Sequence, residues 1–227
     1  MSTWRSESSV IGSASDYAKR VFLFSNAVWA ACITNYYLDH KRSDLPLLQQ
    51  RLLMSCGWLY TMRYPIQTFY TLTSRPVPSE ELYGLPFWLP ITYLVPSYFA
   101  KQRKLKNSLD YIDYIGIGMT VIGHLFVIIS EAQRKIFKSK PENKGKLYTS
   151  GLNSITRHPN HFGEVLLIIG WSLFSRNRKL ALVWPSIVIT FLYGYVVPDL
   201  EQYLKTRYSS EWPDYAKNVK NYIPFIL

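Results

Sequence analysis

Arginine, histidine, asparagine and glutamate side chains gather over eight residues at the start of a hydrophobic segment. They are Arg157, His158, Asn160, His161 and Glu164. Ionisable groups that enter a bilayer are costly and are functional candidates by default. In this setting His158 can bind a phosphate, donate a proton or form an ordinary structural hydrogen bond, and Glu164 can pair with Arg157 as a structural ion pair. The cluster therefore predicts a polar site at the edge of a hydrophobic helix.

A basic run precedes this cluster and supplies charges suited to phosphate. Its members are Arg134, Lys135, Lys138, Lys140, Lys144 and Lys146. If the preceding helix continues through Gln133 to Lys138, Arg134 and Lys138 lie one turn apart on one face and can grip a phosphate together. A solvated basic face on anionic lipid is the competing interpretation.

The tail after Pro198 is amphiphilic and rich in aromatic residues, among them Tyr208, Trp212 and Tyr215. Such side chains either lie at the membrane–water interface or cover a cofactor that the preceding loop holds. To enclose one cofactor, the segment 131–164 and this tail must share one side of the membrane. We predict that they do.

Apolar helices must position these groups. A bilayer core is spanned by roughly 20 apolar residues, and six nearly uncharged stretches approach that length: Val21–Tyr37, Leu52–Leu72, Tyr83–Ala100, Tyr111–Ser130, Val165–Ser175 and Leu180–Val197. They are apolar all round, and a chain of 227 residues cannot bury six such helices under polar cover. We predict an all-α integral membrane bundle of about six transmembrane helices with an amphiphilic C-terminal tail. The fifth helix should be short and tilted or partly re-entrant, and the sixth should end at Pro198.

Arg63 interrupts the second stretch. A charge in the middle of a span costs a few kcal/mol unless it is paired or faces a polar cavity. We therefore expect Arg63 to face the bundle interior and to meet a carboxylate, phosphate or carbonyl, with Asp113 and Glu164 as the candidate acids.

Composition excludes several classes of protein. A hydrophobic content of 48% excludes intrinsic disorder, and two cysteines exclude a disulfide scaffold. The net charge of +11 lies in loops beside the apolar stretches, which suits anchoring on lipid phosphates, and no nucleic-acid motif or metal-ligand spacing accompanies it. Residues 1–20 form a Ser-rich segment without the apolar core of a signal peptide, so we expect no cleaved signal. Residues 21–227 are expected to form a single domain.

A resemblance to a known family is carried by the string RHPNHFGE at Arg157–Glu164, with NKGK at Asn143–Lys146 and GL at Gly151–Leu152 before it. These motifs resemble the steroid 5-alpha-reductase-like family of membrane proteins. That family is related to sterol C14/C7 reductases and, more distantly, to isoprenylcysteine carboxyl methyltransferases. The tail, from Glu201 onward, follows the same pattern. The resemblance is dense over Glu131–Leu227 and fainter over residues 50–130.

In the reductase branch, the resemblance implies NADPH in a membrane-embedded pocket and hydride delivery to an activated carbon–carbon double bond of a lipid. It implies catalytic roles for His158 and Glu164. It also implies cofactor contacts by a larger set: Gln133, Arg134, Lys138, Arg157, His158, Asn160, Tyr208 and Tyr215. The expected partners are membrane lipids and a hydrophobic, lipid-like substrate. The endoplasmic reticulum is the favoured location, with the mitochondrial inner membrane as the alternative.

Departures from the family pattern leave two other functions open. His161 stands where the family usually has tyrosine, Ile168–Gly170 replaces a Trp-rich stretch, and Asp199 stands where sterol reductases usually have arginine. These departures suit a non-catalytic, lipid-binding accessory subunit of a larger membrane complex, for example a respiratory one, with protein partners and no cofactor. An S-adenosylmethionine-dependent methyltransferase is the other alternative, because that branch shares the Arg-His-Pro turn. The NKGK segment and the Gly163–Glu164 pair favour the reductase branch.

Overall fold

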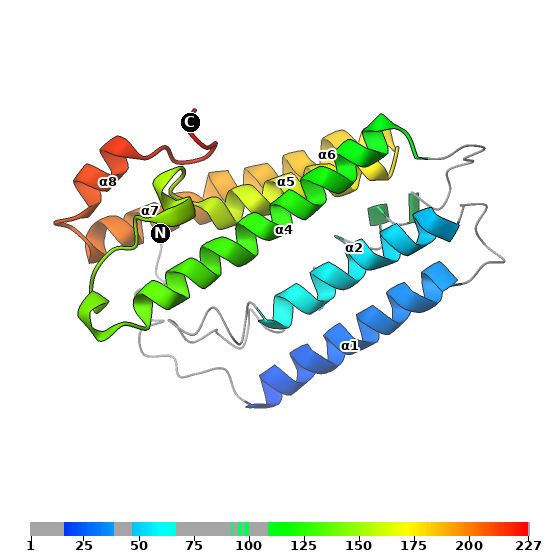
Figure 1. The fold of residues 1–227 in the computed structure, drawn as a ribbon, viewed down its shortest axis with the longest axis horizontal. Helices are drawn as coiled ribbons and strands as arrows, with labels where there is room; N and C mark the ends of the chain where they lie inside the picture. The colour runs from blue at the N-terminus through cyan, green and yellow to red at the C-terminus, as the bar shows by residue number, and fades with distance from the viewer. Residues whose placement is uncertain are drawn as a thin grey trace. The chain divides into compact units, whose positions relative to one another are not determined.

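The structure is a computed structural model that describes residues 16–38, 47–66 and 109–226, together with positions 92, 95, 96, 98 and 99. The regular secondary structure of these residues is helical (Figure 1), which confirms the predicted all-α class for this part of the chain. The chain divides into two compact units. One comprises Met1–Ile117 and Trp171–Ala181, and the other comprises Gly118–Gly170 and Leu182–Leu227.

In the first unit, helices α1 (Asp16–Leu38) and α2 (Leu47–Ile66) pack side by side (Figure 1). The indole Nε1 of Trp58 donates to the hydroxyl of Thr34 at 3.0 Å and links the two helices. Both helices coincide with predicted apolar stretches and begin a few residues earlier. The end of the second predicted stretch and nearly all of the third lie outside the described residues.

Arg63 is buried within α2, with 3% of its surface exposed. Its guanidinium carbon lies 5.1 Å from the ring centroid of Tyr60, within reach of a cation–π contact. The expected interior position of this charge is confirmed, and its pairing with Asp113 or Glu164 stays a prediction.

Helix α4 (Tyr111–Lys138) is 28 residues long. At 1.5 Å per residue it extends about 42 Å, longer than a bilayer core of about 30 Å. The predicted continuation of the helix through Gln133 and Lys138 is confirmed. The helix is therefore long enough to cross the hydrocarbon core and still leave its charged C-terminal turns outside it.

Aspartates fix the start of α4. The Oδ1 atom of Asp110 accepts the backbone N–H groups of Ile112 at 2.9 Å and Asp113 at 3.2 Å, which caps the helix. Arg176, in the turn before α6, forms an ion pair with Asp110, and its Nε lies 3.3 Å from Asp113 Oδ1. The first unit thus holds the start of α4 against this turn through charged groups.

In the second unit, α4 meets α5 (Pro159–Phe174) through glycines. A Cβ atom at Gly123 would lie 2.5 Å from the carbonyl oxygen of Gly163, and one at Gly163 would lie 2.7 Å from the carbonyl oxygen of Gly123. Only residues without a Cβ permit this approach, as is common between membrane helices. Nearby, the rings of Phe126 and Phe162 pack edge to face with centroids 5.2 Å apart. The 16 residues of α5 confirm a short fifth helix.

Helices α6 (Arg178–Phe191) and α7 (Val197–Arg207) are joined by a π-helical turn (Leu192–Val196) into one continuous helix. The prediction that the sixth stretch ends at Pro198 is therefore wrong. Proline breaks a helix because it lacks the N–H of the regular ladder. Here Pro198 follows directly on a π turn, where that ladder is already interrupted, and it occupies the first turn of α7, where proline is tolerated.

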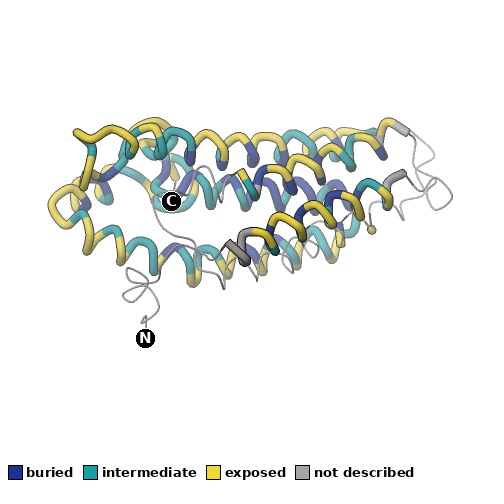
Figure 2. The backbone as a smooth tube through the Cα atoms, turned by 90° about the horizontal axis from the view of Figure 1, so that it is seen from below, coloured by how far each residue is buried: buried dark blue, intermediate teal, exposed yellow. Residues whose placement is uncertain are grey.

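Helix α4 and the helix Arg178–Arg207 each contain an 18-residue window with a mean hydropathy of 1.9. Only 33% and 22% of these windows are buried, so exposed positions recur along both helices (Figure 2). Their exposed apolar side chains include Ile122, Leu125, Ile128, Ile129, Leu182, Val183 and Ile187. Such surfaces suit a hydrocarbon solvent. These two helices are long and apolar enough to cross a membrane, and the total of six spans stays a prediction.

Candidate functional site

The signature turn before α5 holds a carboxylate of α7. The Nε and NH2 groups of Arg157 donate to the two oxygens of Glu201 at 3.0 and 2.9 Å, which is a bidentate ion pair. The Nε2 atom of His158 lies 2.6 Å from Glu201 Oε1, and His158 is 2% exposed. Because a carboxylate only accepts, His158 donates in this bond. The predicted pairing of Arg157 with Glu164 is therefore wrong, and Glu201 takes that place.

The third nitrogen of Arg157 secures the C-terminal tail. NH1 donates to the carbonyls of Ala216 at 2.9 Å and Val219 at 2.6 Å, at the end of helix α8 (Trp212–Asn218). The backbone N–H of Arg157 also donates to the carbonyl of Lys220 at 2.8 Å. Arg157 thus joins the turn, α7 and the tail, with every guanidinium nitrogen donating to a protein group.

A second carboxylate is bound by the same turn. The Nδ2 atom of Asn160 donates to Glu131 Oε1 at 3.2 Å, and Arg134 forms an ion pair with Glu131 Oε2. Glu131 is 3% exposed, whereas the side chain of Arg134 keeps 37% of its surface exposed. Asn160 and Arg134, both predicted cofactor contacts, are thus brought together around a carboxylate. Arg134 retains open surface for a further anion.

Gln133 holds the loop that precedes the signature turn. Its Oε1 accepts the N–H of Leu152 at 3.0 Å, in the short helix Gly151–Ser154. Gly151 has a φ of +59°, and a Cβ there would lie 2.3 Å from Gln133 Oε1. The left-handed backbone conformation favours glycine at this position, and a larger residue would also displace the Gln133 side chain.

Lys138 and Tyr208 meet at the end of α4. Lys138 Nζ donates to the phenolic oxygen of Tyr208 at 3.0 Å and also bonds to the carbonyl of Lys146. The same ammonium lies 4.8 Å from the centroid of the Tyr208 ring. Beside them, the N–H of Leu147 donates to the carboxylate of Glu211 at 3.1 Å. The loop and the tail therefore lie together, as the predicted enclosure of one site requires.

Tyr215 has a different environment from Tyr208. Its hydroxyl donates to the carbonyl of Asn153 at 2.7 Å, and the residue is 7% exposed in a cluster with Leu147 and Trp212. Burial is the main reason why its pKa rises to about 12. Tyr215 therefore stays protonated and holds the tail against the loop.

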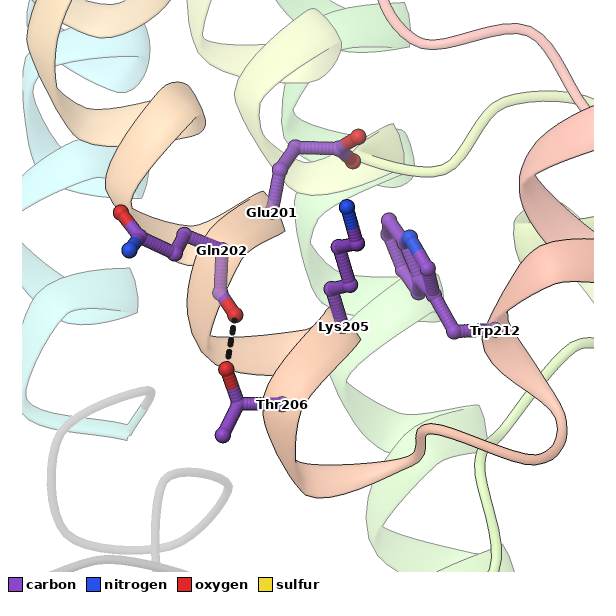
Figure 3. Close-up of a pocket in the computed structure, with 5 residues that line it drawn as sticks. All are labelled: Glu201, Gln202, Lys205, Thr206 and Trp212. Carbon is purple, nitrogen blue, oxygen red and sulfur yellow. Dashed lines mark hydrogen bonds between the residues drawn. The ribbon is translucent and has the colours of Figure 1, made fainter.

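A pocket of about 620 Å³ opens beside the carboxylate of Glu201. Figure 3 shows the Lys205 side chain extending between the Glu201 carboxylate and the Trp212 ring. Gln202 and Thr206, one turn apart on α7, complete the lining, and the Thr206 hydroxyl donates to the Gln202 carbonyl at 3.0 Å (Figure 3). The pocket combines a carboxylate, an ammonium and an indole face.

Glu164 and His158, the two predicted catalytic residues, are not joined by a described contact. Glu164 lies partly buried in α5, six positions after His158. His158 precedes the first residue of α5 and belongs to the Glu201 cluster. Glu201, Glu131 and Lys205 were missed as site residues. For Glu201 the available signal was its place in the tail pattern.

Comparison with known proteins gives one family match and several relatives. The family model described as "Protein of unknown function (DUF1295)" matches residues 81–220. The Probable O-methyltransferase ustE of Ustilaginoidea virens is 34% identical over 101 residues, covering 42% of this chain and 34% of the relative. Protein-S-isoprenylcysteine O-methyltransferase B of Arabidopsis thaliana is 25% identical over 121 residues, covering 51% and 61%.

A reductase is among the relatives as well. Delta(14)-sterol reductase of Arabidopsis thaliana is 25% identical over 130 residues, covering 51% of this chain and 35% of the relative. The chain thus spans less than two thirds of the length of each of these three relatives. Their names divide between methyl transfer and reduction.

Proposed function

Because the chain belongs to the DUF1295 family, we propose that it is a membrane-embedded, NADPH-dependent reductase of a carbon–carbon double bond in a lipid or sterol-like substrate. The predicted kinship with sterol reductases and isoprenylcysteine methyltransferases is confirmed by the relatives. A membrane reductase or methyltransferase is therefore the broad class. We place the protein in the endoplasmic reticulum membrane as part of the same proposal.

The observation that carries the choice of reductase is the positive charge of the segment that contains the signature turn. Between residues 131 and 164 the chain has seven arginines and lysines against three glutamates. NADPH bears a pyrophosphate and a 2′-phosphate, whereas S-adenosylmethionine bears a sulfonium cation and no phosphate. A positively charged binding site attracts NADPH and repels S-adenosylmethionine.

The donor set fits phosphate. Arg134 has a planar guanidinium with open surface, and its neighbour one turn on, Lys138, has an ammonium at the same end of α4. Guanidinium and ammonium groups are the usual protein ligands of phosphate. We assign the phosphate contact to Arg134, whose guanidinium keeps open surface. The roles of Gln133, Arg157 and Tyr215 are then to hold loop and tail around the cofactor.

When bound, NADPH supplies the hydride. The protein's own contribution is positioning. Arg157 and His158 fix Glu201 in one wall of the pocket, and Trp212, which is 6% exposed and lies 5.7 Å from the Arg157 guanidinium, forms another wall. Lys205 adds a positive charge at the pocket mouth.

A methyltransferase is the second candidate, and the coverage of the alignments favours it. The alignment covers 61% of the Arabidopsis isoprenylcysteine methyltransferase but only 35% of the Arabidopsis sterol reductase. The methyltransferase is therefore matched over a larger share of its own length than the sterol reductase. The two candidates differ in the nucleotide that binds, which makes binding the decisive property.

Titration of the purified, full-length protein with NADPH tests the proposal. Wild type should bind, and Arg134→Gln should bind on the order of ten- to a hundredfold more weakly, because a charged hydrogen bond contributes about 1.5–3 kcal/mol. Lys140→Gln removes an equal charge from an exposed position and is the matched control, which should stay near wild type. Loss of the 2′-phosphate contact should also narrow the preference for NADPH over NADH. Binding of S-adenosylmethionine alone would support the methyltransferase, and binding of neither nucleotide to folded wild type would support the accessory subunit.

A further inference from the structure

Two tyrosines of the tail have opposite environments. Tyr215 is buried, and its hydroxyl proton is already donated to a backbone carbonyl. Tyr208 is half-buried, and its hydroxyl oxygen accepts a hydrogen bond from Lys138 at 3.0 Å, with the Arg207 guanidinium near its ring. A phenol oxygen has two lone pairs and one proton. Because Lys138 occupies a lone pair and leaves the phenolic proton in place, the O–H group of Tyr208 can still donate a hydrogen bond or a proton.

The charges around Tyr208 are positive on both sides. Lys138 approaches from α4 and Arg207 from the last residue of α7, the latter 5.8 Å from the ring centroid. Glu211 follows in the tail, but its carboxylate accepts the N–H of Leu147. The remaining neighbours, a cluster that includes Leu147, Trp212 and Tyr215, are uncharged. This arrangement stabilises a phenolate.

The pKa of Tyr208 shifts in the direction that this arrangement of charges predicts. Burial alone raises the pKa of Tyr208, but the hydrogen bonds from Lys138 and Arg207, together with their charges, lower it below the usual value of about 10. Tyr208 and Tyr215 thus share a side-chain type but have pKa values displaced in opposite directions. When two groups of one kind have pKa values displaced in opposite directions, the group with the lower pKa is the stronger acid, which here is Tyr208.

We propose, on the basis of the proposed reductase function, that Tyr208 is the proton donor of the reaction and that Lys138 is its positioning residue. Reduction of a carbon–carbon double bond needs a hydride and a proton. The double bond accepts the hydride at one carbon from the reduced nicotinamide, which is oxidised. At the other carbon a C–H bond forms as the O–H bond of Tyr208 breaks. The phenolate that remains is held by Lys138 and Arg207 and regains its proton from water.

His158 is the other proton-bearing candidate, and its geometry fits the role less well. It is 2% exposed, and its Nε2 proton is committed to Glu201 at 2.6 Å. A proton donor must reach the substrate. Tyr208 is partly exposed and its hydroxyl accepts rather than donates in its described hydrogen bond, so it meets this condition in a way that His158 and Tyr215 do not.

Ultraviolet titration of tyrosine in the full-length protein tests the state of Tyr208 without any substrate. The difference between wild type and Tyr208→Phe should show a phenolate forming below pH 10, and Lys138→Met should move that transition to higher pH. Tyr215→Phe is the matched control, and its difference titration should show a transition near 12. A Tyr208 transition at or above 10, or one that Lys138→Met leaves in place, would overturn the proposal.

Transfer of deuterium from 4-deuterated NADPH to extracted membrane lipids tests the catalytic step. Tyr208→Phe should bind NADPH as wild type does but transfer label at least a hundredfold more slowly, a loss typical of a missing general acid. Wild-type turnover should fall as the pH rises through the Tyr208 transition, because the donor must be protonated. Unchanged transfer by Tyr208→Phe would overturn the donor role alone. A wild type that transfers no label while Tyr208 still titrates low would overturn the reductase assignment and the donor role with it.

Discussion

Two carboxylates flank the N-terminus of α5, and one turn of the chain holds both. His158 and Arg157 bind Glu201 from α7, and Asn160 binds Glu131 from α4. The N-terminal end of a helix carries a partial positive charge, so two carboxylates beside it are favourable. The signature turn is thus the point at which three helices of the second unit are joined. Its side chains act first as a structural junction.

Removing Arg157 should therefore release the tail. Arg157→Ala removes four hydrogen bonds to Glu201, Ala216 and Val219 and should lower stability by on the order of 2–3 kcal/mol. Trypsin should then cut faster after the exposed Lys217 and Lys220. Arg178→Ala, at an exposed arginine, is the control and should leave both the melting temperature in detergent and the cleavage rate unchanged. Equal melting temperatures and cleavage rates for Arg157→Ala and Arg178→Ala would contradict the role of Arg157 as a structural junction.

The candidate site was partly predictable from residue types. The run from Arg157 to Asn160 was identified because charged groups at the edge of an apolar segment are unusual, and the structure brings these residues together. Their partners were not predictable, because Glu131 and Glu201 lie 26 residues before and 44 residues after Arg157 in the chain. Without those partners, an arginine that bonds within the protein looks the same in sequence as one that binds a ligand.

Contact between α4 and α5 depends on two glycines, and a third provides a control. Gly123→Ala places a Cβ 2.5 Å from a backbone oxygen of α5, where neither backbone can give way easily. We expect a loss of about 1–3 kcal/mol, measured by thermal unfolding in detergent.

Gly118→Ala, on the same helix, meets nothing within 4 Å. That change should be neutral or stabilise α4 by about 0.5–1 kcal/mol, since alanine favours helix. If the two variants unfold at the same temperature, the close packing of α4 and α5 is wrong.

The elements themselves were predictable to differing degrees. Apolar length predicted α1, α2, α4 and α5, because a helix in lipid must satisfy its own backbone. It failed at Pro198, where a π turn carries the helix onward to Arg207. Side-chain hydropathy does not encode such a turn. The extension places Glu201 and Lys205 on the same continuous helix as the apolar span.

At the scale of the molecule, the loop and the tail should face one side of the membrane. Ser139→Cys and Ser210→Cys, both at exposed positions, should react equally with an impermeant thiol reagent in sealed vesicles. Lys179→Cys lies near the opposite end of the helix Arg178–Arg207 from Ser210 and should show the opposite accessibility. Opposite labelling of positions 139 and 210 would contradict a shared site.

The central claim is that this cationic site serves reduction rather than methyl transfer. The most direct measurement supplies purified wild type with extracted membrane lipids, 4-deuterated NADPH and methyl-labelled S-adenosylmethionine together, and identifies the labelled lipid by mass spectrometry. We predict a lipid that has gained deuterium and lost a double bond, with no labelled methyl group. A lipid that carries the labelled methyl group, or no labelled lipid from a protein shown to be folded, would contradict the claim.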